Sequence, residues 1–255
     1  MKKLLLGLAC FALIFSVSSL GLAKKITVAC DTNFPPFEFK DPQTGEQTGF
    51  DVELWAAIAK KIDLEYELQP MDFNDIIPGL ESGQLDVGIA GMTIKPERAK
   101  VIDFSDGYYK AGLLLLVRID NTNIRSIEDL KGKTVATKLG TSSVDYLKTN
   151  ASGADVKLFP NNDAMFLELM SDGVSAVFFD SPVVSDYLLK AGKGKAKIVG
   201  PLYQGEDYGI GFPKGSDLVK KVNDALKALR ADGTYNALYM KWFGPEPQYE
   251  YLNLM

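Results

Sequence analysis

The chain has 255 residues, of which 46% are hydrophobic and 24% charged, as in ordinary globular proteins of one or two domains. Acidic residues outnumber basic ones by 33 to 28, and the net charge of −5 argues against a nucleic-acid or anionic-membrane partner. The sequence contains no histidine, the commonest proton shuttle and metal ligand, which disfavours the commonest enzyme chemistry without excluding an enzyme. We expect no metal, no cofactor and no catalytic residue.

Residues 1–23 have the layout of a secretory signal peptide, with two lysines before a long apolar run that closes on small residues. The run is close to the roughly 20 residues that span a bilayer, so an uncleaved anchor is the main alternative. A lipid anchor through Cys10 is a third reading. We expect cleavage after Ala23, which leaves a periplasmic chain with 26 basic and 33 acidic residues and with Cys30 as its one cysteine.

Short apolar runs alternate with amphipathic segments after this leader. Strands are predicted at 25–30 (KITVAC), 64–68 (LEYEL) and 85–91 (LDVGIAG). Helices are predicted between them, at 49–62 (GFDVELWAAIAKKI) and 73–83 (FNDIIPGLESG). Strand and helix in alternation favour a mostly parallel sheet flanked by helices.

The same alternation restarts after the apolar run at 112–119 (GLLLLVRI) and predicts a second α/β unit. The last part, 207–244, has one short strand and two helical stretches separated at Gly233, too few elements for a unit of its own. We expect it to pack on the first unit, so that the chain crosses between two lobes near 113–117 and again near 208–212.

The predicted fold is therefore α/β and two-lobed, with two hinge strands joining the lobes. Lobe 1 comprises 24–112 and 212–255, and lobe 2 comprises 113–211 with both hinge crossings. Ligands of open α/β sheets bind beyond the carboxyl ends of the strands, and a cleft between domains is a common small-molecule site. The carboxyl ends of the strands, here called strand exits, are therefore the places to look for a binding site.

Two exits of lobe 1 carry an aromatic ring. Asp31 and Phe34 follow the first strand, in a loop stiffened by two prolines, and Phe73 begins a helix that Asp72 could cap. Each of these residues also has a plain alternative, as a solvated turn residue, a cap or a core ring.

The third exit of lobe 1 is richer in polar groups. Gly91 allows close approach of the backbone, Thr93 offers a hydroxyl, and Pro96 starts a short helix that carries Arg98. An arginine one turn into a helix opposes the helix dipole unless an anion compensates it. The alternative is a solvated charge, or a pair with Asp103 or Asp106.

Two strand exits of lobe 2 also carry candidate binding residues. Lys138 precedes a glycine turn and the hydroxyls of Thr141 and Ser142, where the amides of a helix start suit a carboxylate. Asp180 ends a strand just before another helix. Ordinary helix caps are the alternative for both places.

Four of these residues form a charge-balanced set, with Arg98 and Lys138 positive and Asp31 and Asp180 negative. The planar fork of an arginine matches a carboxylate, and a carboxylate accepts from an ammonium group. Such a neutral set predicts a zwitterionic ligand.

Several stretches closely resemble the periplasmic glutamine-binding proteins of bacterial ABC importers, within the polar amino-acid solute-binding family, over nearly the whole mature chain. They include FPPFEF, GFDVELWAAIAKK, YELQPMDFNDIIPGL, AGMTIKPERAKVIDFSDGYYKAG, GTSSVDY and DGTYNALYMKWFG. The resemblance implies the two-lobed periplasmic binding protein fold, a monomer, and hinge closure on L-glutamine followed by recognition by a membrane permease.

The resemblance also implies a role for each site residue. The ligand would stack between Phe34 and Phe73, and its side-chain amide would meet Asp31 and Lys138. The full implied set is Asp31, Phe34, Phe73, Ala90, Gly91, Thr93, Arg98, Lys138, Thr141, Ser142, Phe179 and Asp180. In it, Arg98, Thr93 and amides near Ser142 hold the carboxylate, while Asp180 and the Gly91 carbonyl hold the ammonium group.

One departure bears on the ligand, because Phe179 stands where relatives carry a histidine. Other amino acids such as glutamate or histidine are therefore alternatives to glutamine. Some proteins of this fold are periplasmic dehydratases and others are ligand cores of glutamate receptors. We expect a binding protein rather than an enzyme, because no acid is left over beyond the binding set.

Overall fold

The computed structural model describes residues 25–245 of the chain. The predicted signal peptide at 1–23, with the alternative lipid site Cys10, and residues 246–255 of the predicted lobe 1 lie outside the described residues. No helix in the described part is long and apolar enough to cross a membrane.

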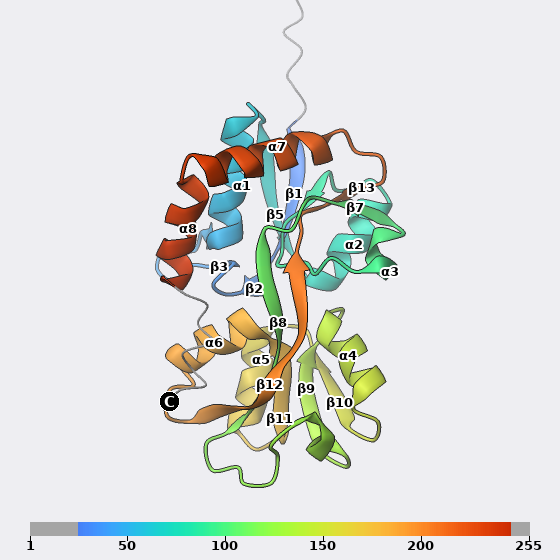
Figure 1. Ribbon diagram of the computed structural model, residues 1–255, viewed down its shortest axis with the longest axis vertical. Coiled ribbons are helices and arrows are strands. Elements are labelled where there is room, and N and C mark those ends of the chain that lie inside the picture. The colour runs from blue at the N-terminus through green and yellow to red at the C-terminus, as the bar shows by residue number, and fades with distance from the viewer. Residues whose placement is uncertain (1–24, 246–255) are drawn as a thin grey trace, which may run out of the picture.

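Two lobes lie one above the other, each built on a five-stranded sheet (Figure 1). The sheet of the upper lobe has the strand order β5-β1-β6-β13-β7. Its strands are β1 (Ile26–Asp31), β5 (Tyr66–Met71), β6 (Val87–Gly88), β7 (Ile102–Phe104) and β13 (Gly211–Pro213). A small sheet beside it consists of β2 (Asn33–Phe34), β3 (Glu38–Lys40) and β4 (Gln47–Thr48).

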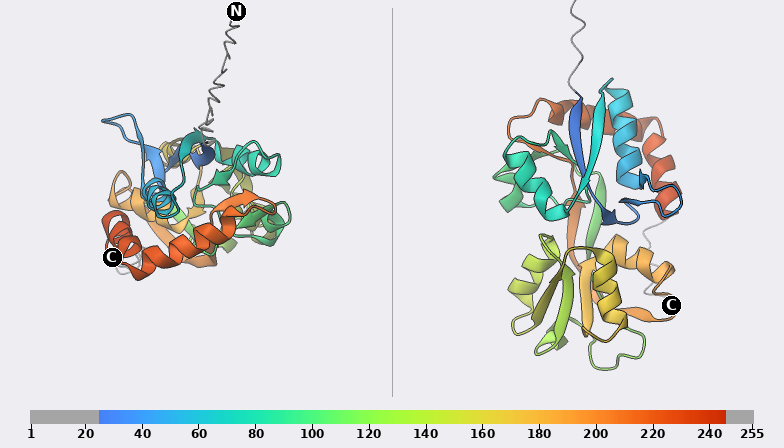
Figure 2. Two further views of the ribbon diagram at one scale, coloured as in Figure 1. Left: turned by 90° about the horizontal axis from the view of Figure 1, so that it is seen from above. Right: turned by 180° about the vertical axis from the view of Figure 1, so that it is seen from behind.

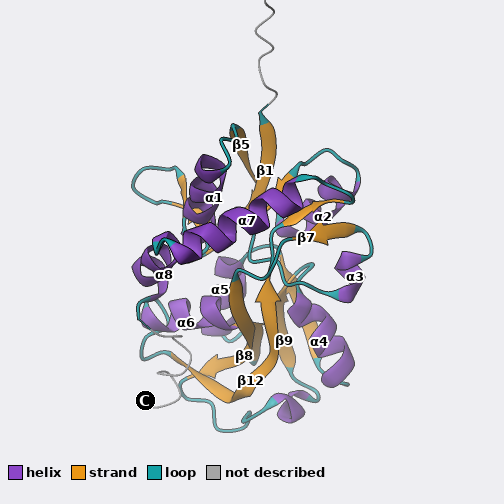
Figure 3. Ribbon diagram, turned by 45° about the horizontal axis from the view of Figure 1, so that its top comes forward, coloured by secondary structure: helices purple, strands orange, loops and turns teal. Residues whose placement is uncertain are grey.

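Helices cover the upper sheet on both sides, as Figure 3 shows. They are α1 (Phe50–Lys61), α2 (Phe73–Glu81), α3 (Pro96–Ala99), α7 (Leu218–Ala231) and α8 (Thr234–Phe243). The last two come from the C-terminal part of the chain and pack on α1.

The sheet of the lower lobe has the order β10-β9-β11-β8-β12. Its strands are β8 (Tyr109–Arg118), β9 (Thr134–Lys138), β10 (Asp155–Phe159), β11 (Ala176–Asp180) and β12 (Ala196–Tyr208). Its helices are α4 (Ser142–Asn150), α5 (Asn162–Met170) and α6 (Ser181–Leu189), with a short 3-10 helix at Ile127–Leu130.

The two-lobed α/β architecture confirms the predicted fold class, but the sheets are mixed rather than mostly parallel. In each sheet the first three strands in order are parallel, and the last two pair antiparallel. The strands antiparallel to both of their neighbours are β13 and β8, and at each of these the chain enters the sheet from the other lobe instead of through a helix.

The connection between the lobes is a two-stranded ribbon. β8 and β12 pair antiparallel from Tyr109 with Tyr208 to Arg118 with Ala196, so β8 runs from the upper lobe into the lower one and β12 runs back (Figure 1; from behind in Figure 2). Because Leu113 already pairs with Asp180 in the lower sheet, the first crossing comes before it. The second reaches the upper sheet at β13.

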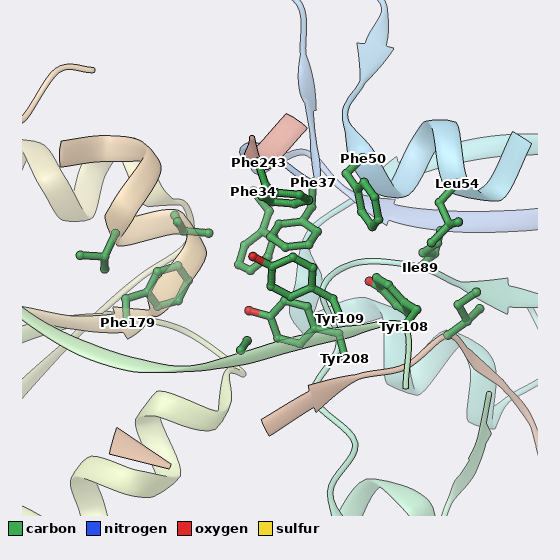
Figure 4. Close-up of a cluster of buried hydrophobic side chains, with 14 of the residues drawn as sticks. Phe34, Phe37, Phe50, Leu54, Ile89, Tyr108, Tyr109, Phe179, Tyr208 and Phe243 are labelled. Carbon is green, nitrogen blue, oxygen red and sulfur yellow. The ribbon is translucent and has the colours of Figure 1, made fainter. Parts of the chain in front are cut away.

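Buried aromatic rings gather where this ribbon enters the upper lobe (Figure 4). The ring of Phe37 lies 4.9 Å from that of Tyr109, and Tyr109 stacks on Tyr208 at 5.8 Å between centroids. Phe50 and Phe243 complete the cluster from α1 and α8. Packed rings of this kind resist displacement, so they hold the upper end of both hinge strands in one place.

Candidate ligand-binding site

A cavity lies between the lobes, where strands of both sheets end. About 240 Å³ of atom-free space lies within it, including space open to solvent. The residues that line it come from both lobes, and all belong to the predicted set: Asp31, Phe34, Phe73, Gly91, Thr93, Arg98, Lys138, Thr141, Ser142 and Asp180. The structure thus brings these side chains together, while their contacts with a ligand stay a prediction.

Arg98 connects the two lobes from its position on α3. Its Nη1 donates to the Thr93 carbonyl at 2.9 Å, and its Nη2 donates to the Gly140 carbonyl of the lower lobe at 3.1 Å. The guanidinium carbon lies 5.4 Å from the ring centroid of Phe73. Two carbonyls and a ring therefore hold the guanidinium at the cavity.

Two local expectations near this arginine differ from the structure. Asp103, an alternative partner for Arg98, pairs with Lys214 at 2.8 Å, and this contact lowers the pKa of Asp103. Asp72 precedes the helix that begins at Phe73, as predicted, but its side chain makes no capping hydrogen bond.

Lys138 and Asp31 form a second connection between the lobes. The Lys138 ammonium donates to the Asp31 carboxylate, with the lysine side chain 1% exposed and the aspartate side chain 2%. Lys138 also donates to the Asn33 carbonyl at 3.3 Å and lies 5.8 Å from the ring centroid of Phe34. A buried ion pair therefore forms one wall of the cavity.

Asp180 ends β11 at the opposite wall and is 4% exposed. The Tyr208 hydroxyl donates to its Oδ2 at 2.5 Å. Burial and the neighbouring carboxylate raise the pKa of Tyr208 well above its usual value, so the hydroxyl keeps its proton. Asp180 makes no capping hydrogen bond to α6, which disfavours the alternative reading as a cap.

Tyr208 was not predicted as a site residue. Its position in the predicted second crossing at 208–212 was a usable signal, because a tyrosine at a hinge lies within reach of both lobes.

Gly91 fits tightly beneath Phe34. Its φ of +51° favours glycine, and a Cβ there would lie 2.3 Å from Cε1 of the Phe34 ring. Its N–H donates at 2.9 Å to Oδ2 of Asp51, which also accepts from the Tyr108 hydroxyl at 2.6 Å. Sequence reasoning missed Asp51, because an acid in the first turn of a helix is an ordinary complement to the helix dipole.

The start of α4 faces the cavity through Thr141 and Ser142. The Thr141 hydroxyl donates to the Lys138 carbonyl at 2.6 Å and lies 2.7 Å from the Ser143 hydroxyl. Thr141 makes no capping hydrogen bond to the helix. The predicted hydroxyl cluster therefore ties the helix start to β9 instead of capping it.

Two predicted residues do not border the cavity. Ala90 is 1% exposed and packs in the core of the upper lobe. Phe179 is 0% exposed, and its ring meets that of Phe34 edge-on with 6.0 Å between centroids (Figure 4). Side chains alternate between the faces of a strand, so Phe179 points away from the face that presents Asp180.

The family model for bacterial extracellular solute-binding proteins, family 3, matches residues 26–245. The L-cystine-binding protein TcyJ of Escherichia coli is 33% identical over 96% of both chains. The arginine-binding extracellular protein ArtP of Bacillus subtilis is 36% identical over 96% of this chain and all of the relative. The glutamine-binding protein GlnH of Bacillus subtilis is 34% identical over 88% of this chain and 82% of the relative.

Solved structures agree with the observed fold. An ancestral arginine-binding protein superimposes with a TM-score of 0.82 at 46% identity, both bound to arginine and bound to glutamine. These alignments cover 86% and 87% of this chain and 98% of the other. The ancestral amino acid-binding protein AncCDT-1, a precursor of cyclohexadienyl dehydratase, has a TM-score of 0.80 at 40% identity, covering 86% of this chain and 95% of the other.

Proposed function

Because the chain belongs to the bacterial extracellular solute-binding proteins, family 3, we propose that this amino-acid-binding protein of an ABC transporter captures L-glutamine. The relatives bind cystine, arginine or glutamine, so family membership alone leaves the ligand open.

The observation that carries this proposal is the buried pair of Asp31 and Lys138 at the cavity. A carboxylate beside an ammonium offers one acceptor and one donor with no net charge. A side-chain amide can donate to the first and accept from the second, which suits glutamine. A ligand with a cationic side chain would be repelled by Lys138, and a ligand with an anionic side chain would be repelled by Asp31.

The remaining charged groups suit the backbone of an amino acid. Arg98 offers guanidinium donors to a carboxylate, and Asp180 offers a carboxylate to an ammonium group. Phe34 and Phe73 enclose the aliphatic stem between them. The carboxylate and the ammonium group of the ligand would thus each bind a side chain of opposite charge in the cavity.

The mechanism is closure about the β8–β12 ribbon. A ligand that contacts both lobes stabilises the closed arrangement by its differential affinity for that state. The closed monomer then delivers the amino acid, outside the cytoplasmic membrane, to the permease. The predicted signal peptide supports a periplasmic location.

Arginine is the second candidate, because the ancestral protein at 46% identity was solved with arginine as well as with glutamine. Glutamate and histidine remain further candidates, since Phe179 places a buried ring beside Asp180. A dehydratase-type activity is a further alternative through the likeness to AncCDT-1. A turnover assay with a prephenate-like acid separates that alternative from simple binding.

A thermal-shift screen followed by calorimetry tests the ligand. Glutamine should raise the melting temperature of the mature chain most among glutamine, arginine, glutamate, histidine and cystine, because a ligand of the native state stabilises it according to its affinity. A shift with glutamate or arginine but none with glutamine would show that the choice of ligand is wrong.

A further inference from the structure

Two buried carboxyl groups, those of Glu38 and Asp51, lie behind the Gly91 turn of the cavity. Glu38 belongs to β3 and Asp51 to the first turn of α1, and both residues are 0% exposed. Asp51 Oδ2 accepts from the Gly91 N–H and the Tyr108 hydroxyl. Asp51 Oδ1 and both Glu38 oxygens are buried and accept no hydrogen bond from an N–H or O–H group among residues 25–245.

The two carboxyl groups lie close enough to hydrogen-bond to each other, which requires a proton on one of them. Two ionised carboxylates in contact and away from water would repel each other and lack their hydration. One proton turns the same contact into a charge-assisted hydrogen bond. This bond uses Asp51 Oδ1 and one of the two Glu38 oxygens.

The environment decides which residue carries the proton. Asp51 has two donors on Oδ2, which favour its charged form, whereas Glu38 has none. The other titratable groups that act on Glu38 are Asp31 and Cys30, both on β1, and none of them is a cation. Burial and then the nearby acids raise the pKa of Glu38 well above its usual value, whereas that of Asp51 rises, through burial, only to about 6.

We propose that Glu38 is held protonated and donates a hydrogen bond to Asp51, and that this carboxyl pair positions the Gly91 peptide and the Phe34 ring for the ligand. The first half concerns the folded protein alone, and the second half rests on the proposed function. Glu38 and Asp51 are positioning residues, since neither lines the cavity.

The positioning follows from the geometry of one peptide. The Gly91 N–H points inward to Asp51, and in a planar trans peptide the preceding Ala90 carbonyl then points the opposite way, away from the acids. The Phe34 ring lies so close over Gly91 that the space would not admit a Cβ. Loss of the anchor would therefore shift both the backbone of the turn and the ring.

Carboxyl NMR of the protein labelled with ¹³C-glutamate tests the proton without any ligand. At pH 7 one glutamate resonance should stay at the position of a protonated carboxyl group, and it should be missing in Glu38→Gln. In the control Glu67→Gln, on the exposed surface of β5, a resonance should be lost from the ionised position instead. If every glutamate is ionised at pH 7, the proposal is wrong.

Asp51→Asn gives a second, sharper outcome in the same spectra. The new amide can accept the bonds from Gly91 and Tyr108 through its oxygen and donate to Glu38 through its nitrogen. A neutral donor then replaces the neighbouring acid, so the Glu38 resonance should titrate at a lower pH than in the unmodified chain, although burial still acts on it. An unchanged titration in this variant would overturn the assignment of the hydrogen bond to Asp51.

Calorimetry of glutamine binding tests the positioning role. Glu38→Leu removes the donor and should weaken binding by about tenfold or more, the effect of leaving a buried carboxylate oxygen unpaired. Glu38→Gln restores a donor and should recover most of that loss, while Glu67→Gln should follow the unmodified chain. Equal affinities for the Leu variant and the unmodified chain would refute positioning. If no amino acid binds to any of these proteins, the proposed function is wrong, and the NMR spectra still show whether Glu38 is protonated.

Discussion

Arg98 is held at the cavity by contacts from outside its own short helix. The four-residue helix α3 is too short to stabilise the charge, and its dipole opposes a cation near its start. The carbonyls of Thr93 and Gly140 and the Phe73 ring hold the guanidinium instead. Such an arrangement keeps a carboxylate-binding fork oriented before the ligand arrives.

Arg98→Ala should abolish measurable glutamine binding. The ligand carboxylate would lose its main partner in a buried site, at a cost of roughly 2 to 5 kcal/mol. Calorimetry measures the effect, with Arg125→Ala on the exposed surface of the lower lobe as a control for loss of one positive charge. Tight binding by the Arg98 variant would contradict the assigned role.

Glu38 and Asp51 predict a pH dependence of stability. A carboxyl group whose pKa is higher in the folded than in the unfolded state stabilises the fold fully when the pH is below the unfolded pKa, roughly 4. This contribution is lost as the pH rises through the folded pKa. The folded pKa of Asp51 is about 6, and that of Glu38 lies well above the usual range. Both groups therefore favour the folded state at acidic pH and disfavour it as pH rises.

Glu38→Gln should accordingly gain stability relative to the unmodified chain as pH rises from 5 to 9. The amide keeps a donor for Asp51 and has no proton to lose. Urea unfolding of the ligand-free proteins measures the difference, and Glu67→Gln should show no such trend. A difference that stays constant with pH would mean that Glu38 does not titrate in this range.

At the scale of elements, the exits of strands β1, β9 and β11 place Asp31, Lys138 and Asp180 at one cavity. The hinge strand β12 reaches the same place through Tyr208, whose hydroxyl donates to Asp180. The strand that crosses between the lobes is thus hydrogen-bonded to an acid of the binding site. Tyr208 also lies against the Phe34 ring at 6.2 Å between centroids, so hinge and site are in direct contact.

Tyr208→Phe should destabilise the ligand-free protein by roughly 1 to 3 kcal/mol, the cost of leaving a buried acceptor without its donor. It should also weaken glutamine binding, because the Asp180 carboxylate loses a contact that orients it. Urea unfolding and calorimetry measure the two effects. Tyr66→Phe removes a hydroxyl from the edge strand β5 and should change neither binding nor stability to this extent.

At the scale of the whole molecule, the ion pairs Lys138–Asp31 and Lys95–Asp145 connect the lobes in different surroundings. Lys138 and Asp31 are almost fully buried, whereas Lys95 and Asp145, 2.5 Å apart, have side chains that are 14% and 61% exposed. Exposed pairs contribute little, whereas removal of one partner of a buried pair leaves an uncompensated charge. The closed arrangement should therefore depend on the buried pair.

Lys138→Met should open the ligand-free protein, since separation of the lobes returns Asp31 to water. Small-angle X-ray scattering would record a larger radius of gyration for the ligand-free variant than for the ligand-free unmodified chain, and added glutamine should not make the variant compact. Lys95→Met removes the exposed pair between the same lobes and should keep the compact form. Equal radii for the two variants would show that the buried pair does not hold the lobes together.

Local patterns in the sequence determined the alternation of strands and helices and the strand exits that carry Asp31, Lys138 and Asp180. They also determined the helix start at Pro96, because periodicity and helix termini depend on neighbouring residues. The tertiary structure alone decided which strands run antiparallel, that the Phe179 ring packs edge-on against Phe34 of the other lobe, and that Glu38 meets Asp51. These outcomes depend on pairing in space between residues distant along the chain, which no local pattern encodes.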